Sequence, residues 1–294
     1  MKPAPFNYFA PASLEEALAL KAQHGEEAKA LAGGQSLIPA MNFRVAQPAI
    51  LVDLNRIASL RDIRKNGALT IGAMTTQSTA EKNPLVAEHV PLLHEALPNI
   101  AHPQIRNRGT IGGSVAHADP AAELPVVCLA LRTRMQAQSQ SGERWIEAQE
   151  FFSGLFSTAL AADELLTAVE FPLVEERTGY AFLEVARRHG DYAMAGLAAV
   201  LSLDENGLCR QARLVYLNVG DGPLEATQAA ASLQGQKPSA KAFQDAGKIA
   251  SQEDMQPFGN LHASPQYQQH LSAVLTQRAL QLALNRITQK ATHP

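Results

Sequence analysis

Ala32-Gly33-Gly34-Gln35-Ser36 and Thr110-Ile111-Gly112-Gly113-Ser114 are two short segments, far apart in the chain, whose chemistry points to the fold. Each contains a glycine pair beside a hydroxyl side chain. Glycine has no Cβ, so it accepts positive φ and lets backbone N–H groups come close to a bulky anion. The neighbouring hydroxyl adds one more donor. We therefore expect two loops that face each other and hold a diphosphate between them.

A diphosphate held by two loops is typical of a dinucleotide cofactor such as FAD. One glycine pair alone would indicate only a turn, so the inference depends on both segments together. The sequence contains neither G-x-G-x-x-G nor G-x-x-x-x-G-K-[ST]. This argues against a nicotinamide-type Rossmann site and against a P-loop.

Length and composition fit a globular protein with one large domain or two domains. The chain has 294 residues, of which 46% are hydrophobic and 18% are charged, enough for a full core. A net charge of −3 argues against a general nucleic-acid binder. No apolar run approaches the length of a membrane span, and Met1–Phe6 lacks the apolar region of a secretory signal. We expect a cytoplasmic protein without a membrane span.

The cysteines and histidines predict no metal site. Cys128 and Cys209 are far apart in the sequence, and we expect both to be reduced core thiols. The nine histidines are scattered, and none belongs to an H-E-x-x-H motif. We therefore predict no iron–sulfur cluster, no structural zinc and no catalytic residue carried by this chain itself.

The first part of the chain mixes helices and strands. Ser13–Glu16 is a capping box that opens a helix ending near Gly25. Leu85–Leu97 has helical spacing with a break at its proline, and Asp119-Pro120 predicts a helix with Asp as N-cap and Pro in the first position. Strands are expected at 28–32, 48–53, 69–73 and 166–171, with a hairpin across 134–146.

After Pro172 the pattern changes to a three-stranded meander followed by helices. Strands are expected at 180–187, 197–203 and 212–218, and helices at 224–233, 240–250 and 267–287. Asp204–Gly207 joins the last two strands as a hairpin turn. This is an α+β pattern. We expect a first domain at 1–175, with subdomains of about 1–55 and 56–175, and a C-terminal domain at 176–294.

These motifs and their order resemble the FAD-binding medium subunits of molybdenum hydroxylases, the family of carbon monoxide, xanthine, aldehyde and N-heterocycle dehydrogenases. The matching stretches are Ala32–Pro39 with Val52–Leu54, Thr110–Ser114 with Ala118–Pro125, Arg187–Ala193, and Tyr267–Ala279. The resemblance covers nearly the whole chain. It implies a vanillyl-alcohol-oxidase (PCMH)-type FAD-binding domain of two subdomains, and a C-terminal domain with a three-stranded antiparallel sheet and helices.

The resemblance also assigns cofactor contacts. They fall on Ala32, Gly33, Gly34, Gln35, Ser36, Leu37, Thr110, Ile111, Gly112, Gly113, Ser114, Glu123, Leu166 and Tyr192. Family members often have His where this chain has Gln35, whose amide donates but carries no charge. Glu123 is expected either to accept from sugar hydroxyls or to stabilise a helix start. Tyr192 would lie against the isoalloxazine ring or pack locally, and Leu166 would touch the flavin or belong to the core.

Other polar residues near these motifs are expected to have structural roles. Asp119 is expected to cap a helix, with a ligand role as the alternative. Asp53 is expected to end a strand or lie in a turn, with a cofactor contact as the alternative. His117 is expected to be structural and not a proton carrier at flavin N5. Arg106 and Arg108 are expected at the surface, with a phosphate or a partner's acidic face as the alternative. The single Trp145 is expected to pack or to contact another subunit.

The resemblance implies a subunit that relays electrons. Substrate would be oxidised on a separate large molybdopterin subunit, and electrons would pass through a small [2Fe–2S] subunit to FAD here and on to an external acceptor. A dimer of heterotrimers is the expected assembly. Two alternatives stay open: a self-sufficient flavin oxidoreductase of the same FAD-domain type, and a non-catalytic assembly protein with the same fold.

Overall fold

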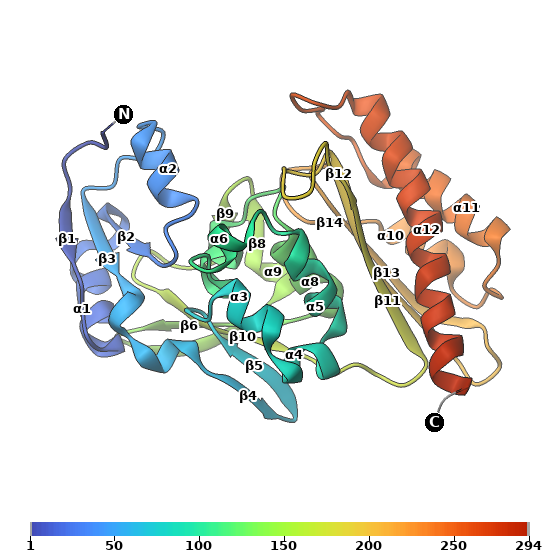
Figure 1. The fold of residues 1–294 in the computed structure, drawn as a ribbon, viewed down its shortest axis with the longest axis horizontal. Helices are drawn as coiled ribbons and strands as arrows, with labels where there is room; N and C mark the ends of the chain where they lie inside the picture. Colours follow the sequence, from blue (N-terminus) through green and yellow to red (C-terminus); the bar gives the residue numbers. More distant parts are fainter. Residues whose placement is uncertain (1, 293–294) are drawn as a thin grey trace.

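The structure, a computed structural model, describes residues 2–292, with side chains to residue 289. Three units lie in a row along the molecule (Figure 1). The first is a parallel sheet in the order β1-β3-β2, made of β1 (Asn7–Phe9), β2 (Ala28–Leu31) and β3 (Ile50–Asp53). Helix α1 (Leu14–His24) packs on it, and α2 (Leu37–Asn42) follows β2.

The capping box at the start of α1 is confirmed. Ser13 Oγ accepts from the Glu16 N–H at 3.2 Å, and the Glu16 carboxylate reaches back to the Ala12 N–H at 2.9 Å. The helix ends at Gly25, whose φ of +50° suits glycine. Strand β1 was not expected from the sequence, because three exposed residues carry no alternation and their pairing with β3 is long-range.

The central unit is a five-stranded antiparallel sheet in the order β4-β5-β10-β6-β7. Its strands are β4 (Ile63–Asn66), β5 (Ala68–Gly72), β6 (Arg134–Ser139), β7 (Gly142–Glu147) and β10 (Leu165–Phe171). One face packs against helices, which are α3 (Gln77–Lys82), α4 (Pro84–His89), α5 (Pro91–Ala96), α6 (Pro103–Arg106), α7 (Ile111–His117) and α8 (Glu123–Leu131). A short helix and a small hairpin complete the unit: α9 (Ala148–Phe151), β8 (Phe152–Gly154) and β9 (Ser157–Thr158). The strands and the hairpin expected here are confirmed.

Two helix predictions in this unit had different outcomes. The break expected at the proline within 85–97 is confirmed, because Pro91 cannot continue α4 and instead opens α5. Asp119 does not cap α8. Its carboxylate accepts from the Ala121 N–H at 2.9 Å in a local turn, and α8 starts at Glu123 after Ala122.

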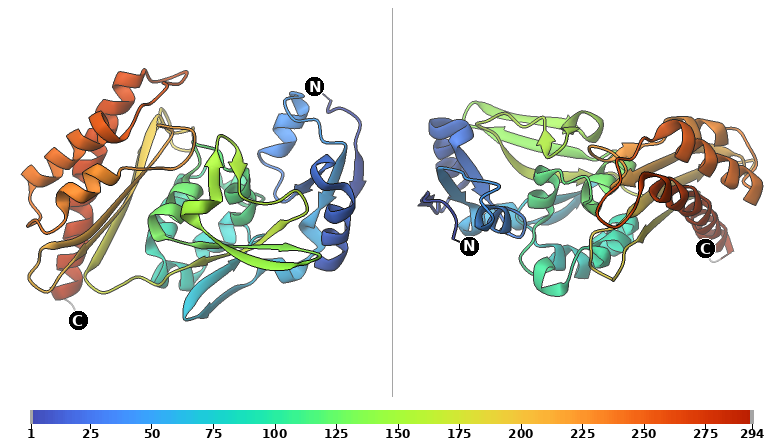
Figure 2. Two further views of the ribbon diagram at one scale, coloured as in Figure 1. Left: turned by 180° about the vertical axis from the view of Figure 1, so that it is seen from behind. Right: turned by 90° about the horizontal axis from the view of Figure 1, so that it is seen from above.

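The C-terminal unit is an antiparallel sheet of β11 (Thr178–Val185), β12 (Ala195–Leu203), β13 (Cys209–Leu217) and the short β14 (Leu224–Glu225). Three strands were expected. Leu224 lies in β14, so α10 (Thr227–Leu233) starts later than expected. α11 (Ala240–Ile249), a π-helical turn (Ala250–Asp254) and α12 (Pro265–Thr292) follow. Figure 2 shows these helices on the outer face of the sheet.

Both faces of this C-terminal sheet are buried. Tyr180, Phe182 and Val215 face the central helices, whereas Ala181, Leu214 and Tyr216 face α11 and α12. The strands therefore carry nearly continuous apolar runs, since neither face meets water. The sheet is the shared wall between the FAD-binding part expected from the sequence and the C-terminal helices. None of the described helices has both the length and the apolar character needed to cross a membrane.

Candidate cofactor site

The two glycine segments meet, although about 75 positions separate them in the sequence. A Cβ placed on Gly33 would lie 2.2 Å from the Arg108 carbonyl oxygen and 2.7 Å from Gly109 Cα. A Cβ placed on Gly113 would lie 3.2 Å from Ala32 Cβ. Backbone crosses backbone here at a distance that only glycine allows. The contact joins the first unit of the molecule to the second.

The first segment presents a row of backbone donors. Within residues 2–292, the N–H groups of Gly33, Gly34, Gln35, Ser36 and Leu37 donate to no protein acceptor. Gly34 has a φ of +74°, and its carbonyl accepts from the Ile38 N–H at 3.1 Å as α2 begins. Successive amides free of internal partners form an anion-binding concavity.

The second segment uses its amides internally. Ile111 N–H donates to Thr75 O at 2.9 Å, Gly112 N–H donates to Ala73 O at 2.9 Å, and Gly113 N–H donates to Thr110 Oγ1 at 3.0 Å. The segment is the first turn of α7 and not a loop, with Thr110 as its N-cap. The expectation that the Gly112 and Gly113 amides face an anion therefore fails. That Thr110–Ser114 borders the cofactor stays a prediction.

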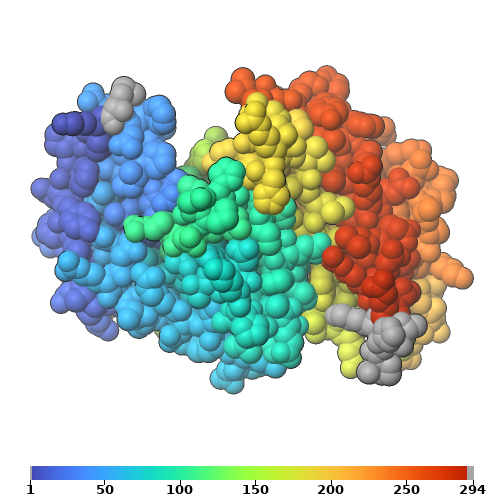
Figure 3. Space-filling view, in the orientation of Figure 1, coloured from blue at the N-terminus to red at the C-terminus, as the bar shows by residue number. Residues whose placement is uncertain are grey.

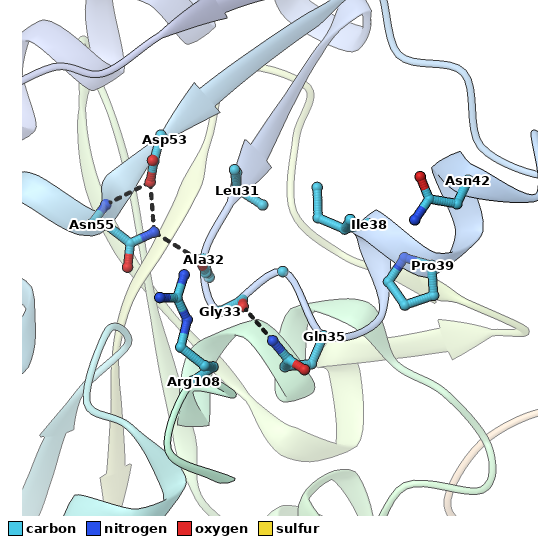
Figure 4. Close-up of a pocket in the computed structure, with 11 residues that line it drawn as sticks. Leu31, Ala32, Gly33, Gln35, Ile38, Pro39, Asn42, Asp53, Asn55 and Arg108 are labelled. Carbon is cyan, nitrogen blue, oxygen red and sulfur yellow. Dashed lines mark hydrogen bonds between the residues drawn. The ribbon is translucent and has the colours of Figure 1, made fainter. Parts of the chain in front are cut away.

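A cavity of about 340 Å³ opens beside the first segment. Its lining residues are Leu31, Ala32, Gly33, Gly34, Gln35, Ile38, Pro39, Asn42, Asp53, Asn55 and Arg108. Figure 4 shows the Arg108 side chain extending from below the glycine loop toward the Asp53 and Asn55 side. Arg108 is exposed, as expected, and it is also the one cationic side chain among these lining residues. In Figure 3 the surface between α2 and the central unit is hollowed.

Asp53 and Asn55 fix one wall of the cavity. Asp53 Oδ1 accepts from the Asn55 N–H at 2.9 Å and from Asn55 Nδ2 at 2.6 Å. Asn55 Nδ2 also donates to Ala32 O at 2.9 Å, and the Tyr8 hydroxyl donates to Asp53. Burial disfavours the charged form of Asp53, but the hydrogen bonds from Tyr8 and Asn55 outweigh it and lower the Asp53 pKa. Sequence reasoning missed Asn55, whose only signal is its position two residues after the strand-end aspartate.

Acidic groups gather at the other end of the second segment. Glu123 is partly buried at the first position of α8. Burial, and next the charge of Glu184, raise the pKa of Glu123 to about 8. Burial likewise raises the pKa of Glu184 to about 7, and its Oε2 is buried without a hydrogen-bond partner. At pH 7 the Glu123 carboxyl is therefore mostly protonated, so it offers a donor as well as acceptors.

Tyr192 lies close to this acidic group. Partial burial of its hydroxyl and the nearby carboxyls of Asp119 and Glu123 raise the Tyr192 pKa. The side chain is nevertheless largely exposed, with 69% of the residue's surface accessible. A largely exposed aromatic ring can cover a planar ligand. Its role against the isoalloxazine stays a prediction.

The remaining site candidates have varied surroundings. Leu166 is 6% exposed and belongs to the central core, so its contact with the flavin stays a prediction. His117 ends α7 with its ring 5.1 Å from the Phe156 ring, and burial lowers its pKa despite Asp119. Arg106 is buried, which corrects the surface expectation: it pairs with Glu81 at 2.8 Å and donates to Ile100 O at 3.0 Å.

The other residues singled out in the sequence do not line this cavity. Trp145 is 37% exposed on β7, with the Arg134 guanidinium 5.2 Å from its ring. Cys128 and Cys209 are buried free thiols, as expected. In the described part of the chain, no three His, Cys, Asp or Glu side chains are grouped to hold a metal ion.

The first segment and Arg108 fit a dinucleotide diphosphate. The fit rests on free consecutive amides, the positive φ of Gly34 that shapes the turn between them, and one cation at the cavity wall. The carboxyl of Glu123 and the exposed ring of Tyr192 add groups suited to sugar hydroxyls and to a planar ring system.

Comparison with known proteins gives consistent matches over nearly the whole chain. Residues 4–174 match the family model described as "FAD binding domain in molybdopterin dehydrogenase", and residues 180–283 match "CO dehydrogenase flavoprotein C-terminal domain". The alpha subunit of the 6-hydroxypseudooxynicotine dehydrogenase complex of Paenarthrobacter nicotinovorans is 42% identical over 287 residues, 97% of each chain. The carbon monoxide dehydrogenase medium chain of Hydrogenophaga pseudoflava is 37% identical over 96% of this chain and 98% of its own.

Solved structures agree. A chain of the Hydrogenophaga pseudoflava carbon monoxide dehydrogenase superposes with a TM-score of 0.93, at 38% identity, over 97% of this chain and 99% of the other. A chain of quinoline 2-oxidoreductase from Pseudomonas putida 86 gives a TM-score of 0.92 at 37% identity, over 98% of this chain and 99% of that one. These TM-scores and sequence identities show that the similarity includes the fold as well as the sequence.

Proposed function

Because this chain belongs to the FAD-binding medium subunits of the molybdenum hydroxylases, we propose that it carries electrons within such a complex, from a [2Fe–2S] subunit to an external acceptor. Its cofactor is FAD, and it is a subunit of an oxidoreductase. When bound, FAD supplies the conversion between two-electron and one-electron transfer, while the protein supplies position and electrostatics.

The observation that carries the proposal is the set of free amides at Gly33–Leu37 beside Arg108. These groups would bind the diphosphate, since each N–H aimed at a phosphate oxygen replaces a lost water hydrogen bond. Arg108 would add a positive charge and a planar set of N–H donors that suits phosphate oxygens. Gln35 Nε2 donates to Gly33 O at 3.2 Å, so this side chain would stiffen the loop and leave anion binding to the amides.

The other assigned residues would hold the rest of the cofactor. Thr110–Ser114 would support the first segment from below and line the ribityl chain. Glu123, mostly protonated at pH 7, would both donate to and accept from sugar hydroxyls. Tyr192 would cover one face of the isoalloxazine and Leu166 would pack against it. The two-domain division at about residue 175 belongs to the same proposal, and the two family matches on either side of it support that division.

The partners we propose are a small [2Fe–2S] subunit and a large molybdopterin subunit, assembled as a dimer of heterotrimers. The relatives are named as a subunit alpha of a dehydrogenase complex and as medium chains, which supports a multi-subunit assembly. A cytoplasmic location is part of this proposal. The unpaired thiols Cys128 and Cys209 support it, since oxidising compartments favour disulfides.

The proposal is tested with the full chain. We expect the purified chain to take up FAD and to show its absorbance near 450 nm, and a reduced [2Fe–2S] partner to bleach this band. Arg108→Met is expected to weaken FAD binding by about tenfold, since a charge-assisted contact is lost. Arg210→Met, at an arginine that pairs with exposed Glu175, is the control and should leave binding unchanged.

Each alternative predicts a different result. Failure of the reduced partner to bleach the bound flavin would contradict the proposed electron-relay function. Bleaching of the single chain by a small-molecule substrate would favour the self-sufficient oxidoreductase. A colourless chain that takes up no FAD would favour the assembly protein.

A further inference from the structure

Asn218, just after β13, connects two segments of the cofactor site. Its Nδ2 donates to Ala193 O at 2.5 Å, and its backbone N–H donates to Pro120 O at 2.8 Å. Its φ of +58° lies in the left-handed region, which asparagine tolerates better than most residues. One residue thereby holds a loop that precedes β12 and a turn that precedes α8.

Gln268 on α12 completes this connection from the far side of the sheet. Its Nε2 donates to Met194 O at 2.9 Å and to Asn218 O at 2.6 Å, and its Oε1 accepts from the Gly259 N–H at 3.0 Å. The residue is 1% exposed. All three hydrogen bonds go to backbone, so the amide is fully used to fix main-chain positions.

The segments that these two amides hold carry the groups assigned to the flavin end of the site. Tyr192 directly precedes Ala193 and Met194, and Met194 N–H is itself tied to Val185 O at 2.7 Å. Asp119 directly precedes Pro120, and Glu123 follows three residues later. Tyr192 and these carboxyls lie close enough for their charges to interact. Their relative placement therefore depends on Asn218 and Gln268.

We propose that Asn218 and Gln268 are positioning residues for the cofactor site, which set Tyr192 against the turn at Asp119–Ala122 without touching the cofactor themselves. The inference rests on the proposed function, because it assumes that FAD lies against Tyr192. The hydrogen bonds also make a prediction that needs no FAD: residues 192–195 are held by the two amides and loosen when either amide is lost.

The test replaces each amide by the acid of the same shape. In Asn218→Asp the new carboxylate would face Ala193 O, and in Gln268→Glu it would face two carbonyl oxygens, so attraction becomes repulsion. Asn206→Asp in the exposed hairpin turn and Gln281→Glu on the exposed face of α12 are matched controls. Amide hydrogen exchange of the full chain without FAD, and FAD titration by flavin fluorescence, are measured for all of them.

We expect exchange of the Met194 amide, which donates to Val185 O, to accelerate by about tenfold or more in both test variants, while the amides of Leu197–Leu201 in β12 stay protected. FAD affinity should fall by about tenfold, and the flavin absorption band should shift because the ring next to it moves. At acidic pH the carboxyl introduced at position 218 regains a proton and can donate to Ala193 O again. Both defects of Asn218→Asp should then shrink.

Two results would overturn the inference. One is unchanged exchange of the Met194 amide. The other is exchange that rises equally through β12 and β13, with FAD affinity falling only as far as global stability falls. A wild-type chain that binds no FAD would overturn the proposed function instead, and local loosening at 192–195 would still be measurable in that chain.

Discussion

The two glycine segments share a local sequence pattern, but their backbone amides have different partners. In Gly33–Leu37 the amides are free of protein partners and border a cavity that Arg108 also lines. In Ile111–Gly113 every amide is bonded inside the protein, and the glycines let α7 press onto the β5–α3 connection. A glycine pair beside a hydroxyl therefore indicates close backbone approach, and the rest of the chain determines what approaches.

Gly112→Ala should have the largest effect. Its Cβ would lie 2.3 Å from Ala73 Cβ and 2.8 Å from Ala73 O, so backbone must move. We expect the free energy of unfolding, measured by urea denaturation without FAD, to fall by about 3 kcal/mol or more. Gly222→Ala is the matched control, since nothing lies within 4 Å of its Cβ position. Equal stability of the two variants would show that the second segment is not a packing element.

Glu123→Gln tests whether the carboxyl that follows the second segment is protonated in the folded protein. The Ile111–Gly113 amides of that segment are already bonded within the protein. The folded-state pKa of Glu123 is raised to about 8, from an ordinary 4.5. Its stabilising contribution is therefore fully present below pH 4.5 and is lost as pH rises toward 8. We expect the wild type to lose about 2 kcal/mol relative to Glu123→Gln across this window, after allowance for partial exposure. Parallel stability curves for the two proteins between pH 4.5 and 8 would contradict a neutral, partly buried Glu123.

Gly34→Ala tests the donor role of the first segment. Gly34 has a φ of +74°, and its new Cβ would meet only the flexible ends of Ile38 and Leu31, at 3.2 and 3.4 Å. We expect a loss of about 1–2 kcal/mol in stability and of about tenfold or more in FAD affinity, because the row of amides is turned. Calorimetric titration with FAD measures the second effect. FAD affinity equal to that of the wild type would contradict the assignment of the first segment to the cofactor site.

Removal of the Thr110 and Ser36 hydroxyls should give the smallest effects, the first on stability and the second on FAD affinity. Thr110→Val removes the acceptor for Gly113 N–H, so unfolding free energy should fall by about 1 kcal/mol. The Ser36 hydroxyl caps nothing, so Ser36→Ala should leave stability unchanged and weaken FAD binding about three- to tenfold. Thermal unfolding without FAD and FAD titration separate the two. Lower stability of Ser36→Ala together with weaker FAD binding by Thr110→Val would contradict the roles that we assign to the two segments.

Much of the fold could be predicted because local chemistry and tertiary structure agree. Ser13 and Glu16 cap α1 as their spacing indicates, and the Asp204–Gly207 turn joins β12 to β13. Predictions failed where a contact with a segment distant in the sequence determined the local structure. β1 exists through its pairing with β3, and Asp119, a good N-cap by type, is used by Ala121 in a turn that Asn218 holds from 98 positions away.

The candidate site divides in the same way. Gly33, Gly34 and Ser36 were found from residue type. Asn55 reaches the cavity because β2 pairs with β3, which places its side chain against Ala32 O, and Arg108 reaches it because its backbone crosses Gly33. Arg106 and Arg108 are two residues apart and equally plausible as surface cations. One is buried against Glu81 and the other lines the cavity, because a short helix and turn direct them differently.

The sequence by itself determined where backbone could approach backbone, most of the helices and strands, and which family pattern the chain carries. Only the tertiary structure decided which amides remain free and which carboxyls stay protonated. Whether an N–H has a partner or a carboxyl has water depends on segments remote in sequence. Residue type states what a group can do, and its surroundings in the fold determine which of those interactions it makes.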